Sequence, residues 1–216
     1  ILLDLSSLTF EIAGLTLILE NIKFLRSGTS SHVCYVGGDV NSKLIVIGCG
    51  FKFGGNNGLY ANKVGKTFVF NSTSSLNGRD GFNYHGTLIA NPYEFVFEYD
   101  CHSYDNGLSL EGTCNATTAH DGMSILRVGC VGYNSNGPLL ADVNGCFSVN
   151  YDCTMYDSTR VAGNTKSAYY FDEALAQKEG KAYLINCSGG GVDTYSINSD
   201  KNVDIYIEQT FKGNNI

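Results

Sequence analysis

The sequence repeats a short tyrosine-flanked motif around a cysteine. YDCHSYD occupies Tyr99–Asp105 and YDCTMYD occupies Tyr151–Asp157, and five of the seven residues are identical. Other alternating apolar runs also end in cysteine: LIVIGC at Cys49, ILRVGC at Cys130 and YLINC at Cys187. Three weaker copies end in a polar residue instead: LILEN at Asn21, FVFNS at Ser72 and IYIEQ at Gln209.

The spacing of these eight anchors is the strongest constraint on the fold. Successive intervals are 28, 23, 29, 29, 23, 34 and 22 residues, so the shortest define a unit of about 22 residues and the others contain inserted loops. Such a unit cannot bury its apolar face alone, but stacked coils place like residues above one another at ~4.8 Å. We therefore predict a single all-β solenoid of about eight coils, ~38 Å tall.

Alternation within the runs indicates strands with one buried face. Ile45 and Ile47 share a parity with Cys49, as Tyr99 does with Cys101, so these residues are expected on the same, core-facing side. After each cysteine, Tyr followed by Asp or Asn indicates a polar turn. No segment keeps a 3.6-residue period for long, and the best helix candidate is 169–180.

Composition excludes several classes of protein. The net charge is -7, charged residues are 16%, and no basic run exists, which argues against nucleic acid and anionic membranes as partners. No run of ~18 apolar residues predicts a membrane span. The eight cysteines form no CxxC pair and no HxxxH is present, so we expect buried free thiols and no metal site.

Two segments are distinguished along the chain. Residues 1–14 fit the repeat poorly, and residues 15–216 form the predicted solenoid. Both ends are expected to be cut from a longer chain. A β-sandwich would not explain recurrence near 22 residues, and the LxxLxLxxN pattern of leucine-rich repeats is absent.

Several coils resemble a known family. NCSGGG, CVGYNSNG and CGFKFGGNNG resemble coils of right-handed parallel β-helices of the pectate-lyase (pectin lyase-like) type. DGFNYH, TTAHDG and GPLLADVNG together resemble β-helix proteins encoded by bacteriophages and prophages, including tail spikes. The resemblance implies a polysaccharide partner, a virion-surface or extracellular location and a homotrimer. It leaves open polysaccharide lyase, glycoside hydrolase, epimerase and non-catalytic shaft.

Candidate catalytic residues gather in one part of the chain. If the coils stack, they converge on one lateral face: Asp80, Asp121 and Asp142, with His85 and His120 as helpers. Glycoside hydrolysis needs two carboxyl groups, which neighbouring coils could supply. The resemblance implies Ca²⁺ with Lys or Arg for a lyase, but no acidic cage is visible, so hydrolase chemistry without a cofactor is favoured. Asp in DG and DN pairs is most often a turn residue, which is the structural alternative for each of these aspartates.

Aromatic residues are the candidates for substrate contact. Tyrosine rings stack on the apolar faces of sugars while their hydroxyl groups stay in water. The candidate substrate-binding residues are Tyr60, Tyr84, Tyr133, Tyr156 and Arg127. For Tyr104, Tyr133 and Tyr156 a structural tyrosine ladder is the favoured alternative.

Two functions follow as hypotheses. The first is a depolymerase-type protein that recognises and cleaves a bacterial surface polysaccharide. The second is a non-catalytic structural or adhesive shaft that binds glycans or a protein. The geometry of three carboxylates discriminates between the two hypotheses. If Asp80, Asp121 and Asp142 line one groove within ~10 Å, the catalytic hypothesis is favoured; if each bonds only the backbone of its own turn, the shaft hypothesis is favoured.

Overall fold

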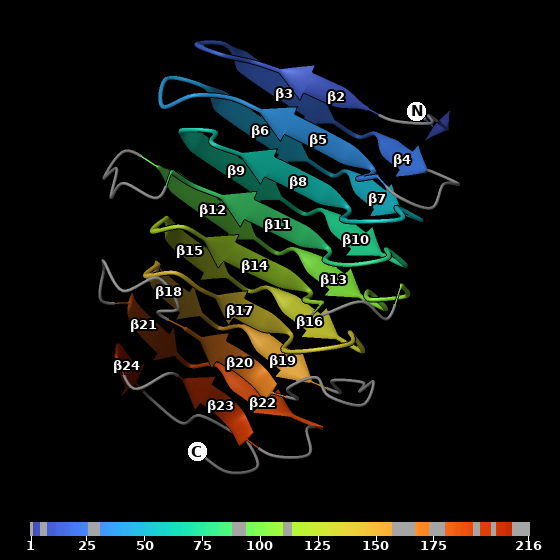
Figure 1. Ribbon diagram of the computed structural model, residues 1–216. Coiled ribbons are helices and arrows are strands. Elements are labelled where there is room, and N and C mark those ends of the chain that lie inside the picture. The colour runs from blue at the N-terminus through green and yellow to red at the C-terminus, as the bar shows by residue number, and fades with distance from the viewer. Residues whose placement is uncertain are drawn as a thin grey trace.

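The computed structural model describes residues 2–4, 8–25, 31–87, 94–109, 114–156, 167–172, 180–191, 195–199 and 202–208. These residues form a parallel β-solenoid in which the chain winds repeatedly through three sheets (Figure 1). Every strand pair in the three sheets is parallel, and the described residues contain no helix. The predicted all-β parallel solenoid is confirmed.

Each turn contributes one strand to each sheet. Sheet A contains β1 (Leu2–Asp4), β4 (Lys23–Leu25), β7 (Gly50–Lys52), β10 (Thr73–Ser75), β13 (His102–Tyr104), β16 (Val131–Tyr133), β19 (Thr154–Tyr156) and β22 (Ser188–Gly190). Sheet B contains β2 (Thr9–Glu11), β5 (Cys34–Gly37), β8 (Leu59–Asn62), β11 (Phe82–His85), β14 (Thr117–His120), β17 (Leu140–Asp142), β20 (Ser167–Phe171) and β23 (Tyr195–Ser199). Sheet C contains β3 (Thr16–Glu20), β6 (Lys43–Ile47), β9 (Lys66–Phe70), β12 (Phe95–Tyr99), β15 (Ser124–Val128), β18 (Phe147–Tyr151), β21 (Gly180–Ile185) and β24 (Val203–Glu208).

The outermost strands of each sheet are edges. Eight strands per sheet therefore leave about six turns that are covered on both sides, slightly fewer than the eight complete coils expected. Residues 1–14 supply β1 and β2, which pair with β4 and β5. A strand joins a sheet through its backbone hydrogen bonds, so this segment adds to the sheets although its sequence matches the repeat poorly.

The predicted helix at 169–180 is wrong in its first part. Tyr169–Phe171 belongs to β20, which pairs with β17 and β23, and Tyr169 and Phe171 are buried. Pairing on both sides and burial decide the conformation of these residues. Residues 173–179 lie outside the described part of the chain.

A left-handed residue marks each described corner between sheets C and A. The φ angles there lie between 47° and 64°, at Asn21, Gly48, Asn71, Asp100, Gly129, Asp152 and Asn186. Gly, Asn and Asp tolerate this region best, which explains their recurrence before the anchor. Asn21 aligns with the Gly48 corner, so the anchor of that turn is Ile22, whose carbonyl accepts from Gly50 N–H, and the expected anchor at Asn21 is wrong by one residue.

The same corner breaks the alternation that the sequence suggested. Leu44 and Val46 are fully buried, whereas Ile45 and Ile47 lie on the outer face. The prediction that Ile45 and Ile47 share the side of Cys49 is therefore wrong. The left-handed residue turns the chain, so the cysteine points inward although its parity matches the outer residues.

The cysteine anchors form one column in the core. Backbone N–H groups of Val131, Thr154 and Ser188 bond the carbonyls of Cys101, Cys130 and Cys153 in successive turns. The Cys130 thiol interacts with those of Cys101 and Cys153. All eight cysteines are buried and free, as expected. Stacking of equivalent residues is thus confirmed.

Candidate functional site

Two histidines stack on the outer face of sheet B. His85 in β11 pairs in register with His120 in β14, and their ring centroids are 4.2 Å apart with planes 9° from parallel. Their neighbours Tyr84 and Ala119 are fully buried, so the period of two turns both imidazoles outward. Stacking of the turns thus joins residues that are 35 positions apart in the sequence.

Asp121 bridges three turns beside these rings. It follows β14 with a φ of 64°, a conformation that Asp tolerates. Its Oδ2 lies 3.1 Å from His85 Nδ1, and its Oδ1 accepts a hydrogen bond of 2.9 Å from Asn144 Nδ2. The hydrogen bond with His85 lowers the pKa of Asp121, against the opposing effect of burial. The carboxylate is therefore ionised at neutral pH.

His120 is held as a neutral ring. Burial, and next the neighbouring His85, lower its pKa to about 4. Its Nε2 lies 3.0 Å from the Thr118 hydroxyl group. The pair therefore combines a neutral imidazole with a His85–Asp121 hydrogen-bonded pair, an arrangement that can hold or move a proton.

A hollow of about 230 Å³ adjoins His120. It is lined by Asn115, Thr118, His120, Pro138, Ala141, Val143, Asn144, Tyr170 and Asp172. Asp172 directly follows β20, and its Oδ2 accepts a hydrogen bond of 3.1 Å from the Tyr170 hydroxyl group. Since β17 separates β14 from β20, the backbone of Asp172 lies about 10 Å from that of Asp121 along the solenoid.

An aromatic strip extends from this site toward the N-terminal turns. Tyr60 on β8 contacts His85 with ring centroids 5.2 Å apart. Its other side stacks on His32 at 4.4 Å, and Tyr35 on β5 lies 5.4 Å from it. Of the tyrosines predicted to bind substrate, Tyr60 therefore does lie beside the predicted histidines.

Asp80 lies at the opposite end of β11 in a structural position. Its Oδ1 accepts a bond of 2.8 Å from Asn115 N–H, and its own N–H donates to Asn57 Oδ1 at 3.2 Å. Its Oδ2 accepts from Asn83 Nδ2 at 2.6 Å. Burial raises its pKa, although these hydrogen bonds oppose the rise. Asp80 thus links three turns at a corner and does not line the hollow.

Three predicted site residues lie inside the solenoid, which corrects their assignment. Arg127 is 0% exposed and Tyr84 is 0% exposed, so neither can contact a polysaccharide in this fold. Asp142 is the last residue of β17 and points inward. Its two oxygens accept bonds of 2.8 Å from Arg127 Nη1 and Nη2. The expected groove of Asp80, Asp121 and Asp142 is therefore not formed.

Glu98 completes the interior cluster and was not foreseen. Arg127 Nε donates to Glu98 Oε2 at 3.2 Å, and the Tyr84 hydroxyl group donates to Oε1 at 2.7 Å. Burial raises the pKa of Glu98 to about 7, against the effect of Arg127. Burial alone would lower the pKa of Arg127, but Asp142 and Glu98 outweigh it and raise that pKa. The cluster is internally satisfied.

Tyr133 and Tyr156 lie on the outer face of sheet A. Tyr104, Tyr133 and Tyr156 stack with centroids 4.8 Å and 5.3 Å apart. The central ring, Tyr133, has both faces covered by its neighbours, so a sugar could stack only on Tyr104 or Tyr156 at the ends of the column. This is the tyrosine ladder named above as the alternative, and it is separate from the histidine site.

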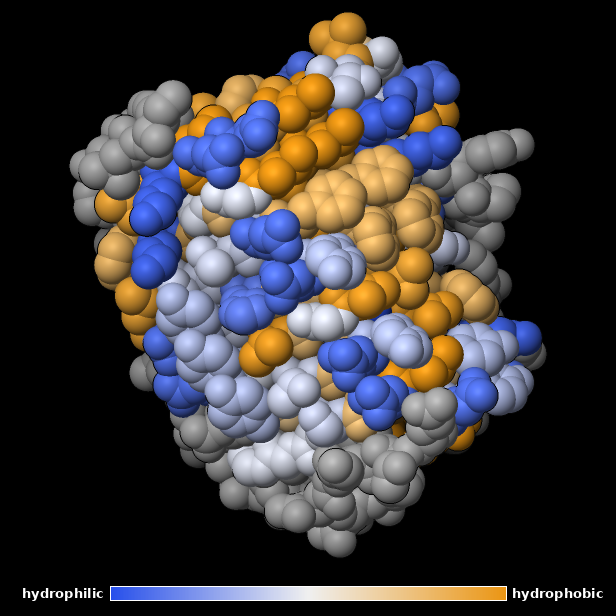
Figure 2. All heavy atoms as spheres, turned by 180° about the vertical axis from the view of Figure 1, so that it is seen from behind, coloured by the Kyte–Doolittle hydropathy of each residue, from blue (hydrophilic) through white to orange (hydrophobic). Residues whose placement is uncertain are grey.

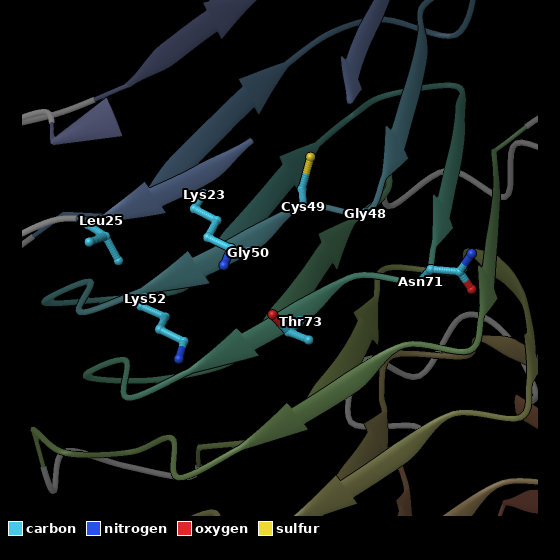
Figure 3. A pocket seen from close by; sticks show the side chains of 8 residues that line it. All are labelled: Lys23, Leu25, Gly48, Cys49, Gly50, Lys52, Asn71 and Thr73. Carbon is cyan, nitrogen blue, oxygen red and sulfur yellow. The ribbon is translucent and has the colours of Figure 1, made fainter. Parts of the chain in front are cut away.

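A larger hollow of about 410 Å³ lies by the corner between sheets C and A (Figure 3). Gly50 lies between Lys23 and Thr73 in an outward-facing column of sheet A. Because Gly50 has no side chain, a gap opens there between its two neighbours. Its lining consists of Lys23, Leu25, Gly48, Cys49, Gly50, Lys52, Asn71 and Thr73. None is a carboxylate, so this hollow has no acid–base pair.

Within the described ranges, no three or more His, Cys, Asp or Glu side chains are grouped so that they could hold a metal ion. No helix within the same ranges is long and apolar enough to cross a membrane.

Together, the sheets and corners define a right-handed parallel β-helix. The solved structure of pectate lyase Pel9A is similar, with a TM-score of 0.51 and 12% sequence identity. The match covers 97% of this chain and 64% of that one, so the chain spans less than two thirds of the length of Pel9A. At this identity the likeness shows the fold alone. No protein-family model and no curated protein matches the chain.

Proposed function

We propose that the chain binds a polysaccharide along the outer face of sheet B and cleaves a glycosidic bond there. The supporting observation is that Asp121 bonds side chains of the turns before and after its own, beside a polar hollow. Asp80 also bonds neighbouring turns, but it is buried, whereas Asp121 is partly exposed beside the hollow. The aromatic strip from Tyr35 to His85 offers a surface for sugar rings.

Hydrolysis is favoured over elimination. Asp121, kept ionised by His85, is suited to activate water, and Asp172, which lines the neighbouring hollow together with Asn144, is the second carboxyl group. The backbones of the two residues lie two strand spacings apart, about 10 Å, and inverting glycosidases hold their two carboxyl groups ~6.5–9.5 Å apart to leave room for a water molecule, so side chains that lean toward each other could reach that range. His85 is then a positioning residue for Asp121. The proposed substrate class is a bacterial surface polysaccharide, and an extracellular or virion location rests on the sequence resemblance.

The test is incubation with a panel of capsular and cell-wall glycans. We expect new reducing ends, with activity lowered about 10²–10⁴-fold in both Asp121→Asn and Asp172→Asn. Asp152→Asn, an exposed corner residue, is the matched control and should keep full activity. Unsaturated sugars among the products would show that the bond is broken by elimination rather than by hydrolysis. Absence of cleavage in every glycan would remove the catalytic proposal.

A second candidate function is a non-catalytic glycan-binding shaft. It is favoured by Asp80 and Asp142, since both predicted catalytic carboxylates are engaged in structural contacts. Glycan binding that is lost in Tyr60→Ala, without product release by the parent protein, would support it. Binding unaffected by Tyr60→Ala would place any glycan away from sheet B.

A further inference from the structure

The outer face of sheet C is unusually apolar. Two of its outward columns run through all eight strands, and their members pair in register. One column consists of Ile18, Ile45, Phe68, Phe97, Leu126, Val149, Tyr183 and Tyr206. The other contains Ile47, Phe70, Tyr99, Val128, Tyr151 and Ile185 between two terminal glutamates. Hydrophobic side chains gather accordingly on the side of the molecule shown in Figure 2.

Several of these side chains remain in contact with water. Ile18 is 57% exposed, Tyr99 47% and Tyr151 46%. Five residue positions across eight strands span about 17 Å by 38 Å, or roughly 640 Å², and the two apolar columns, out of three that face outward, occupy on the order of 400 Å² of it. Exposed apolar patches above a few hundred Å² mark interaction sites in soluble proteins. A face of this size therefore needs a partner of similar extent.

The two long edges of this face carry opposite charge. The strand starts carry Lys43, Lys66 and Lys181, with Asp204 as an exception on the last strand. The strand ends and the corner beyond them carry Glu20, Asp100, Asp152 and Glu208. Within one chain the two edges lie about 13 Å apart along the strands, too far for direct ion pairs.

We propose that this face binds a second copy of the chain, related by a two-fold axis that runs parallel to the solenoid axis between the faces. That operation keeps each turn at its own height and reverses the strand direction. The lysine edge of one copy then meets the acidic edge of the other. A two-fold axis along the strands would instead place lysine against lysine.

The turn order makes the match specific. Lys43 on β6 lies one strand from the partner's Glu20 on β3, and Lys66 on β9 lies one strand from the partner's Asp100 beyond β12. Lys181 on β21 is likewise one strand from the partner's Asp152 and the partner's Glu208. One strand is ~4.8 Å, within reach of a lysine side chain. The apolar columns meet between these edges.

The shape of the face favours two copies over the trimer that the resemblance implied. Two flat faces cover each other completely and bury about 1,300 Å² in total, which is within the range of stable interfaces. Three flat faces around a three-fold axis enclose a triangular space and contact mainly at their edges. The central columns would then stay uncovered.

The first test is the mass in solution, by light scattering after gel filtration and by analytical ultracentrifugation over a concentration series. We expect a dimer. Phe97→Glu should weaken the dissociation constant at least about tenfold, since it places a charge at the centre of the face. Tyr156→Glu, an exposed aromatic residue on sheet A, is the matched control and should leave the mass unchanged. Circular dichroism verifies that both variants fold.

A charge exchange gives the sharper test. Lys43→Glu and Glu20→Lys should each weaken the dimer at least about tenfold, and the double variant should return within about threefold of the parent. These residues are on opposite edges of one chain, so rescue can arise only between copies. A monomer at all concentrations, a trimer, or a dimer indifferent to Phe97→Glu would overturn the proposal.

Discussion

Two clusters of charged side chains occupy neighbouring turns, one inside the solenoid and one on its outer face. Arg127, Glu98 and Asp142 lie inside the solenoid, and each carboxylate is bonded to the guanidinium group. His85 and Asp121 lie on the outer face, beside a hollow, and remain partly exposed. A charged side chain that points into the core is structural, and one on the outer face is available for chemistry. The direction of the side chain, rather than the residue type, decides between the two roles.

The largest expected effect is on the interior cluster. Arg127→Met should lower the free energy of unfolding by about 3–5 kcal/mol, because it leaves Glu98 and Asp142 buried without a cation. Chemical denaturation monitored by circular dichroism measures the change. Arg79→Met, at an exposed position, is the control and should change it by less than about 0.5 kcal/mol. Equal losses in the two variants would contradict the structural role of the interior cluster.

The pH dependence of stability should separate the clusters next. Glu98 has a pKa of about 7 in the folded chain against 4.5 ordinarily, so the folded state binds more protons and this contribution is lost as pH rises from 4.5 to 7. His120 has a pKa of about 4 against 6.5, so its contribution is lost as pH falls from 6.5 to 4. Each is limited to about 3 kcal/mol.

Variants isolate these opposite slopes. In Glu98→Gln, the unfolding free energy should fall only as the pH is lowered from 6.5 to 4. In His120→Gln, it should fall only as the pH is raised from 4.5 to 7. Thermal and urea unfolding between pH 4 and pH 7.5 measure both. Identical pH profiles for the two variants would show that the clusters do not titrate as described.

Two aspartates give a paired comparison of smaller size. Asp142→Asn should cost about 2–3 kcal/mol of unfolding free energy, because it removes a charged, bidentate partner of buried Arg127. Asp121→Asn should cost less than about 1 kcal/mol, since its carboxylate is partly exposed. Urea unfolding of both variants in one buffer is the measurement. A reversed order would place Asp121 among the structural residues.

The smallest effect is expected in the tyrosine ladder. Tyr133→Leu should lower the unfolding free energy by about 0.5–1.5 kcal/mol, because two ring contacts are lost. Glycan binding on sheet B should remain unchanged in the same variant, measured by calorimetry. A loss of glycan affinity without a change in stability would move the binding surface to sheet A.

Several features could be predicted from the sequence because they recur in every turn. The anchors at Cys101, Cys130 and Cys153 fixed the stacking, since equivalent residues of successive coils must occupy one column. Recurrence also brought His85, His120 and Asp121 onto one face. These inferences needed only the length of the repeat, which one sequence displays directly.

The rest was decided by the tertiary structure. A left-handed corner residue such as Asp100 shifts the inward parity by one, so Glu98 and Arg127 enter the core while Phe97 and Tyr99 face outward. Asp172 lines the hollow because β20 pairs in register with β17, so that it follows Phe171 at the same corner where Val143 follows Asp142. Periodicity gives which residues share a side of a strand, but the backbone angle at one corner determines whether that side is core or surface.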